Sequence, residues 1–349
     1  MSRASTQDRR DRYLPAADPA VVYVPATLDA ASSPAVRQAI EDAATTGTPL
    51  VVVDLQRLNF VDLPGLAALT GARRRLNPGQ HLMLSHPSPR IRRLLRLSAA
   101  VGDPITRNHR VGLIVPSSNT TVETEIPALL RAQEGTDTFT FHSSRMRTAQ
   151  LSLANALTLA AMSERCALEL TDAQCDALAF TCLVAVIGSG GDYLGVQRRV
   201  AAAAAAHAGL APVVSTAGAL IAALRALGAQ KAAVISPYVE PLAHLLNRFL
   251  LENGIEVVGQ INLGLADSHA IAEVDPHSLV AQARRLDLTG VDALVLSACV
   301  QMPSLPVVQS VEDELGLPVV TATTATARAI LLALGLRPQV AGAGQLLHR

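Results

Sequence analysis

The sequence contains no tryptophan, and aromatic residues make up only 3% of its 349 residues. It also has no excess of charge, because 29 lysines and arginines balance 29 aspartates and glutamates. A neutral chain lacks the basic surplus on which general binding to nucleic acid or to an anionic membrane depends. The one dense basic stretch, residues 90–96, has the apolar spacing of a solvated helix face. We therefore expect neither a nucleic-acid nor a membrane role.

Long apolar runs and a secretion leader are missing too. No stretch reaches the roughly 18–20 apolar residues that span a bilayer, and residues 1–12 are polar and charged. The cysteines Cys166, Cys175, Cys182 and Cys299 show no Cys-x-x-Cys spacing, which favours reduced thiols. These features predict a cytoplasmic protein.

Signatures of metal and nucleotide sites are absent from the sequence. Its nine histidines form no His-Glu-x-x-His motif and no i, i+4 pair. The glycine-rich residues 188–195 match neither a P-loop nor a Gly-x-Gly-x-x-Gly fingerprint. No metal and no cofactor is therefore expected.

The sequence does contain two regions in which strand and helix patterns alternate. Residues 1–18 are expected to be a disordered lead, and residues 19–102 a first α/β domain. In that domain, the β-branched run 50–55 is typical of a strand buried on both faces. Helices are expected at residues 33–44 and 66–76.

The second region is an internal repeat, which divides near residue 229 into residues 109–228 and 229–349. In each half, an apolar strand precedes a second strand that ends in a cysteine, Cys182 or Cys299. The alternation implies parallel sheets with right-handed crossovers, whose ligands bind beyond the carboxyl ends of the strands. The two thiols are thus expected to face one shared cleft. That layout suits chemistry on the two faces of a small carbon acid or alkene.

Each of these two thiols lies at a strand-to-helix turn, where free backbone N–H groups can stabilise an anion. The same groups are suited to hold a substrate carboxylate. Buried free cysteines are commonly small apolar core residues, an interpretation that we favour for Cys166 and Cys175 but not for the repeated positions Cys182 and Cys299. The N–H groups concerned are those of Leu183, Val184, Val300 and Gln301.

Two polar side chains follow the first strand of each half. Asn119, in the stretch Pro-Ser-Ser-Asn-Thr-Thr, is suited to donate an amide hydrogen bond to a carboxylate. The alternative is a loop residue or helix cap. Tyr238 holds the matching place in the second half, and its phenol is suited to donate to a substrate oxygen or simply to pack. The residue types alone leave these alternatives open.

Residues 107–345 closely resemble the maleate isomerases of the aspartate/glutamate racemase superfamily. The resemblance implies a cofactor-independent enzyme that converts maleate to fumarate, and at least a homodimer. The segments that carry it are residues 111–130 (VGLIVPSSNTTVETEIPALL), 139–147 (FTFHSSRMR), 165–171 (RCALELT), 181–187 (TCLVAVI) and 296–307 (LSACVQMPSLPV).

Carried over by position, the resemblance implies that Cys182 is the nucleophile and Cys299 the proton donor. It also implies that side chains and backbone groups hold a small dicarboxylate. The family usually has Asp-Asn where this chain has Asp267-Ser268, so that a shorter hydroxyl replaces an amide. The substrate-holding positions are Asn119, Leu183, Val184, Tyr238, Ser268, Val300 and Gln301.

Residues 19–102 resemble STAS domains, chiefly through residues 50–70 (LVVVDLQRLNFVDLPGLAALT). In regulatory STAS domains a phosphorylatable Ser or Thr precedes the glycine of a turn. Here Pro64 precedes Gly65 and has no hydroxyl, so no phosphorylation switch is expected at this position. A role in docking a protein partner or in oligomerisation remains open.

Three other functions are compatible with parts of this pattern. An amino-acid racemase would use both thiols as acid and base, and would place solvent deuterium at the α-carbon of aspartate or glutamate. Arylmalonate decarboxylation fits less well, because those relatives keep only the second thiol. A regulatory protein with an inactive catalytic domain would make both Cys182 and Cys299 dispensable.

Overall fold

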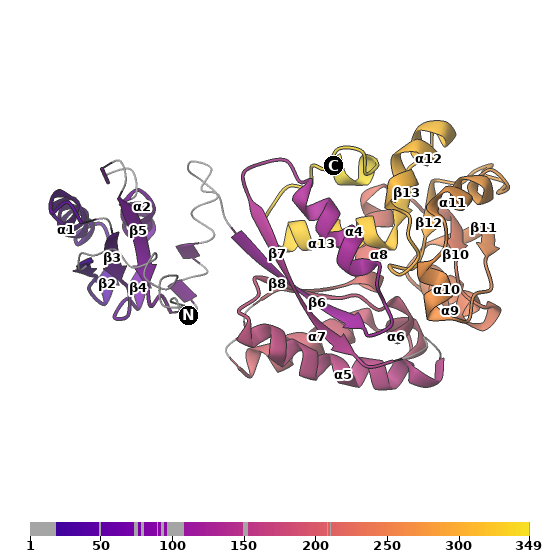
Figure 1. Cartoon of the computed structure of the whole chain (residues 1–349), viewed down its shortest axis with the longest axis horizontal. Helices are drawn as coiled ribbons and strands as arrows, with labels where there is room; N and C mark the ends of the chain where they lie inside the picture. Colours follow the sequence, from indigo (N-terminus) through magenta and orange to yellow (C-terminus); the bar gives the residue numbers. More distant parts are fainter. Residues whose placement is uncertain are drawn as a thin grey trace, which may run out of the picture. The chain divides into compact units, whose positions relative to one another are not determined.

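The backbone separates into two units, Met1–Asp103 and Pro104–Arg349 (Figure 1). The lead expected at residues 1–18 lies outside the described residues, as does part of the basic stretch 90–96. The computed structural model describes residues 19–48, 50–72, 76–77, 80–88, 90–91, 94–95, 108–148, 153–207, 209 and 211–348.

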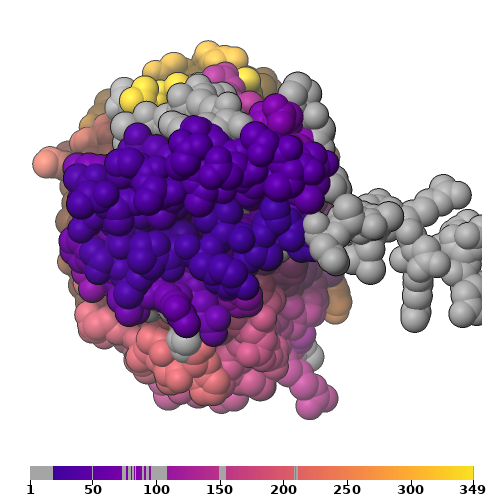
Figure 2. Space-filling model, turned by 90° about the vertical axis from the view of Figure 1, so that its left-hand side faces the viewer, coloured from indigo at the N-terminus to yellow at the C-terminus, as the bar shows by residue number. Residues whose placement is uncertain are grey.

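The N-terminal unit contains a parallel sheet of order β1-β3-β5 and a short parallel pair, β2-β4. Its side chains form the indigo surface in Figure 2. The central position of β3 explains its continuous β-branched run, because Val51, Val52 and Val53 are buried on both faces. The strands are β1 (Ala20–Tyr23), β2 (Thr27–Leu28), β3 (Leu50–Asp54), β4 (Phe60–Val61) and β5 (His81–Ser85).

Two helices of this unit are α1 (Ser33–Thr45) and α2 (Leu63–Thr70). The first agrees with its prediction, but α2 begins three residues before the expected start at 66 and ends before 76. It begins early because the Asp62 carboxylate accepts a 2.8 Å hydrogen bond from the Gly65 N–H and caps the helix. The residues that looked like a turn are therefore the first turn of α2, and Pro64 lies within it.

The C-terminal unit contains two four-stranded parallel sheets of the same order, β7-β6-β8-β9 and β11-β10-β12-β13. Each strand of the second sheet corresponds to the strand numbered four lower, which confirms the predicted duplicated α/β fold. The first sheet comprises β6 (Asn108–Pro116), β7 (Thr138–Met146), β8 (Ala177–Phe180) and β9 (Val213–Ser215). The second comprises β10 (Lys231–Ser236), β11 (Glu256–Asn262), β12 (Ala293–Ser297) and β13 (Val319–Thr321).

Helices cover both faces of the first sheet. In Figure 1, α5 and α7 lie on one face, and α4 and α13 on the other. The described residues include no helix of the length and apolarity that a membrane crossing requires. The helices are α4 (Val122–Arg131), α5 (Leu153–Asp172), α6 (Leu183–Gly188), α7 (Tyr193–Ala205), α8 (Thr216–Ala226), α9 (Glu240–Glu252), α10 (Ser268–Ala272), α11 (Pro276–Ala283), α12 (Val308–Leu315), α13 (Ala322–Ala333), and the 3-10 helices η3 (Leu305–Val307) and η4 (Gln345–His348).

The two halves of this unit interlock. Helix α13 belongs to the second half of the sequence, yet it packs on β8 and β9 of the first sheet and against α4 and α8. One apolar core runs through both halves and includes Phe180 of β8 together with Val234 of β10 and Val295 of β12. This shared core fixes the carboxyl ends of β8 and β12 relative to each other.

Candidate active site

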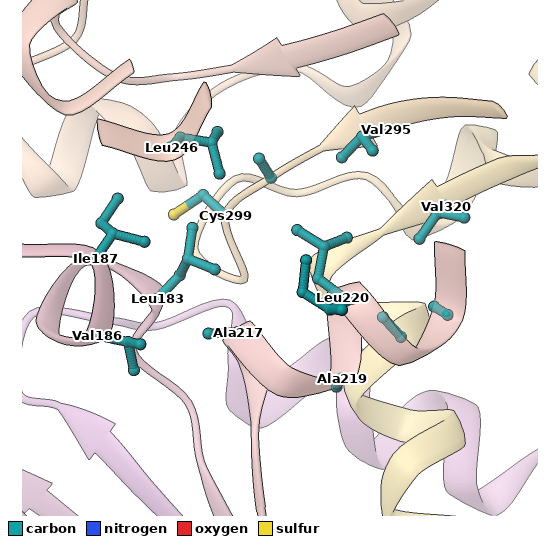
Figure 3. Close-up of a cluster of buried hydrophobic side chains, with 14 of the residues drawn as sticks. Leu183, Val186, Ile187, Ala217, Ala219, Leu220, Leu246, Val295, Cys299 and Val320 are labelled. Carbon is teal, nitrogen blue, oxygen red and sulfur yellow. The ribbon is translucent and has the colours of Figure 1, made fainter. Parts of the chain in front are cut away.

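The structure brings the thiols of Cys182 and Cys299 into one site. Each lies just after a central strand, β8 or β12, and they are only 3% and 4% exposed. Their charges interact, because an ionised Cys299 raises the pKa of Cys182. Figure 3 shows Cys299 of the second half among Leu183 and Ile187 of α6 and Leu246 of α9. The site thus takes one thiol from each half.

Burial is the main influence on both thiols, since apolar surroundings penalise a thiolate. It raises the pKa of Cys182 to about 12 and raises the pKa of Cys299 above its ordinary value. At neutral pH both thiols are therefore protonated when no substrate is bound.

Backbone N–H groups oppose these shifts in pKa. They belong to Ala185 and Val184 at Cys182, and to Gln301 and Met302 at Cys299. The sulfur of Cys182 occupies the N-cap position of α6 without a capping hydrogen bond of regular geometry, so these donors act at somewhat longer range. Each sulfur is thus faced by the second and third N–H groups after it.

Of the four N–H groups expected from the sequence, those of Val184 and Gln301 face the sulfurs. The N–H groups of Ala185 and Met302 also face them and were not expected. A usable signal was present, since an N-cap side chain accepts from the second and third helical residues and not from the first. The other two residues expected to contribute N–H groups are Leu183 and Val300. Each is 3% exposed, and their side chains pack in the apolar cores.

Tyr238 lies beside Cys299, just after β10. Its side chain is 2% exposed, and its hydroxyl is 3.4 Å from the carbonyl oxygen of Ala298. Burial, followed by the neighbouring Cys299, raises the pKa of Tyr238 well above its ordinary value, so the phenol keeps its proton. A hydrogen bond from this phenol in turn lowers the pKa of Cys299, because it stabilises the thiolate. The phenol of Tyr238 thus interacts with the Cys299 thiol as well as packing in the core.

Asn119 holds the start of α4, in line with the interpretation of this residue as a helix cap. It is 1% exposed, and its Oδ1 accepts hydrogen bonds of 3.0 Å from the N–H groups of Thr121 and Val122 at the start of α4. Because the oxygen is engaged by the helix, Nδ2 points away from it. Among the described residues this Nδ2 meets no acceptor, so it remains available to donate.

The side chain of Gln301 links the Asn119 loop to the start of α10. Its Nε2 donates a 3.1 Å hydrogen bond to the carbonyl oxygen of Ser118 and another to that of Ser268. Gln301 and Ser268 are both fully buried. The structure thus connects the Asn119 loop, the loop after Cys299 and the start of α10 through the side chain of Gln301.

Comparison with known proteins gives matches to both units. Residues 111–347 match the family model for arylmalonate decarboxylase, and residues 16–102 match a STAS-domain model. The chain is 47% identical over 247 residues to a maleate isomerase of Geobacillus stearothermophilus, with 70% of this chain and 98% of that enzyme covered.

Two solved structures are similar to the C-terminal unit. The maleate isomerase Iso of Pseudomonas putida S16, determined with maleate, is 42% identical with a TM-score of 0.68, and 69% of this chain and 98% of that chain are covered. A cysteine-to-serine variant of the Nocardia farcinica maleate cis-trans isomerase carries a covalently bound succinylcysteine intermediate. It is 45% identical with a TM-score of 0.67, over 69% of this chain and 98% of that chain. The chain therefore belongs to the maleate isomerase family, and its isomerase part follows a STAS domain.

Proposed function

We propose that this chain isomerises maleate to fumarate through a cysteine-bound succinyl intermediate. The observation that carries the proposal is the interaction between Cys182 and Cys299 in one buried site, with Tyr238 beside Cys299. A nucleophile and a proton donor on facing elements are what covalent isomerisation of an alkene needs. The relatives that bind maleate and form succinylcysteine support the same chemistry.

In the first step, the thiolate of Cys182 bonds to one alkene carbon of maleate. The electron pair of the double bond moves to the other alkene carbon and spreads onto its carboxylate. The backbone N–H groups beside the thiols, the Asn119 amide and the Ser268 hydroxyl stabilise this charge, which is worth most in a buried site. Leu183, Val184, Val300 and Gln301 contribute through their backbones.

In the second step, Cys299 gives its proton to the carbon that carries the charge. The product is a succinyl thioether on Cys182, and Cys299 becomes a thiolate that Tyr238 stabilises. Rotation about the new single bond turns the cis arrangement into the trans one. Cys299 then removes a proton from the same carbon, the C–S bond breaks, and fumarate leaves with Cys182 again a thiolate.

The resting protonation of the site sets a condition for this sequence. Both thiols are protonated in the resting site, since burial raises the pKa of Cys182 to about 12 and also raises that of Cys299. Attack therefore requires Cys182 to lose its proton to solvent, while Cys299 keeps the proton that it later donates. This proton transfer takes place when the substrate carboxylates bind to the backbone N–H groups.

We infer a cytoplasmic homo-oligomer with functional segments 19–102, 109–228 and 229–349, and a protein partner docked through the STAS domain. Exposed apolar side chains of that domain support docking: Tyr23 is 74% exposed, Phe60 50% and Leu63 81%. Sedimentation of the Leu63→Glu variant with and without cell extract would test this role, and unchanged profiles would count against it.

The proposed reaction is tested by proton NMR of maleate with the reduced protein. The wild type is expected to produce fumarate, while Cys182→Ala and Cys299→Ala are expected to produce none. Full activity of Cys182→Ala would exclude the covalent scheme. If the wild type makes no fumarate, aspartate and glutamate should be tested for deuterium exchange at the α-carbon.

A further inference from the structure

A buried carboxylate from the first half, Glu125 on α4, holds the loop that follows Cys299 in the second half. Its Oε1 accepts hydrogen bonds of 2.7 Å from the N–H of Ser304 and 2.8 Å from the N–H of Leu305. Glu125 is 6% exposed, and a glutamate is rarely buried to this extent unless its carboxylate has partners. Burial raises its pKa, and the two N–H groups oppose that rise.

The second oxygen of Glu125 is also enclosed. Among the described residues, Oε2 has no hydrogen bond of regular geometry, although the hydroxyl of Thr323 lies close enough to oppose the rise in pKa. Thr323 is in the first turn of α13, the helix that crosses to the first sheet. Glu125 therefore lies where α4, the Cys299 loop and α13 meet.

Glu125 acts together with Thr121, one helical turn earlier. The Thr121 hydroxyl donates a 2.8 Å hydrogen bond to the carbonyl oxygen of Gln301. Thr121 is the N-cap of α4 and its backbone is already helical. Residues four apart lie on the same side of a helix, so the start of α4 fastens the loop at Gln301 and again at Ser304. Because both points are fixed, the loop has little freedom to move Cys299, which lies two residues before Gln301.

We propose that Glu125 is a positioning residue that fixes the Cys299 thiol by anchoring residues 300–305 to the first half of the enzyme. Glu125 touches neither thiol, so its effect passes through the loop. A displacement of about 1 Å at a reacting group can cost about 100-fold in rate. The expected loss of turnover rests on the proposed isomerase function, but the expected change in the position of the Cys299 thiol does not.

Glu312 provides a matched control. It is also buried, at 9% exposed, and accepts backbone hydrogen bonds of 2.9 Å from Val319 and 2.7 Å from Gln345. These bonds tie α12 to β13 and to the C-terminal segment, and do not involve the Cys299 loop. Loss of either carboxylate removes two buried hydrogen bonds to the backbone, but only those of Glu125 hold the loop that carries Cys299.

The test compares Glu125→Ala, Glu125→Gln and Glu312→Ala in the full chain. For each variant, kcat and KM for maleate are measured, and mass spectrometry gives the ratio of iodoacetamide labelling at Cys299 to that at Cys182. Glu125→Ala is expected to lose about 100-fold in kcat and to raise the labelling ratio about fivefold or more, because the freed loop exposes Cys299. Glu125→Gln keeps an oxygen acceptor, so we expect its kcat and its labelling ratio to be close to those of the wild type. Glu312→Ala is expected to leave the ratio unchanged.

An unchanged labelling ratio in Glu125→Ala would overturn the proposal, as would an equal rise in Glu312→Ala. If Glu125→Gln changes kcat and the labelling ratio as much as Glu125→Ala does, the charge of Glu125 matters and its hydrogen bonds to the loop do not. That result would also overturn the proposal. Should Glu125→Ala fail to fold, Glu125→Asp withdraws the carboxylate by one methylene and gives the same comparison. The labelling ratio decides the question even if the wild type does not convert maleate.

Discussion

The Thr121 hydroxyl donates a 2.8 Å hydrogen bond to the carbonyl oxygen of Gln301, which lies 180 residues later in the chain. The bond is buried and joins the segment after β6 to the loop after β12. The segment after β6 contains Asn119, and the loop after β12 contains Cys299. The two halves are thus linked beside their functional groups, and not only through the apolar core.

This bond predicts that Thr121→Val destabilises the protein. Valine has the shape of threonine but leaves the buried carbonyl of Gln301 without its donor, which costs about 1–3 kcal/mol. Urea unfolding of the C-terminal unit measures the loss. Thr124→Val is the control, because the Thr124 hydroxyl is exposed and bonds within its own helix, to the Thr121 carbonyl at 2.7 Å. Equal losses in the two variants would contradict a role for the bond between the halves.

Removal of the Tyr238 hydroxyl should slow catalysis without unfolding the enzyme. Tyr238→Phe keeps the buried ring but withdraws the donor that stabilises the Cys299 thiolate, so we expect kcat to fall about 100-fold. Steady-state kinetics, followed by the appearance of fumarate, provide the measurement. Tyr193→Phe is the matched control, since Tyr193 makes an edge contact with Phe249 at 6.2 Å and lies outside the thiol site. A normal kcat in Tyr238→Phe would rule out this role.

The raised pKa of Cys182 predicts a steep dependence of its labelling on pH. The pKa is near 12, so the thiol is protonated at pH 7 and the thiolate grows about tenfold for each pH unit below that value. Labelling of Cys182 by iodoacetamide should therefore keep rising from pH 7 to pH 10. A plateau below pH 9 would show that the thiol is already activated in the free enzyme. Maleate should protect Cys182 at every pH, provided that the site is the proposed one.

Substrate affinity should depend on the Ser268 hydroxyl. If this hydroxyl donates to a substrate carboxylate, Ser268→Ala removes a hydrogen bond to a charged group, and we expect KM for maleate to rise about tenfold with little change in kcat. Kinetics with a series of short dicarboxylates would show whether the change is specific to maleate. Ser278→Ala serves as the control, because the Ser278 hydroxyl donates a 2.7 Å hydrogen bond to the carbonyl oxygen of Asp275 at the start of α11. No change in KM would remove Ser268 from the site.

Local patterns predicted much of the fold because strands and helices have different periodicities. The β-branched run at β3, the duplicated strands and the position of a thiol after β8 and β12 all follow from residues within a few positions of one another. The start of α2 was missed because a capping carboxylate, Asp62, outweighed the turn chemistry of the next residues. The candidate thiols were identified from their repetition, although the N–H groups of Ala185 and Met302 were not.

The sequence by itself determined the two-part organisation, the internal duplication and the pairing of Cys182 with Cys299, since each is encoded in local hydrophobic pattern and repeated position. Only the tertiary structure decided that α13 covers the first sheet, that Tyr238 lies beside Cys299, and that Glu125 anchors the loop after it. These relationships join residues far apart in the chain. They depend on how the shared core brings the two sheets together, and no local pattern records that arrangement.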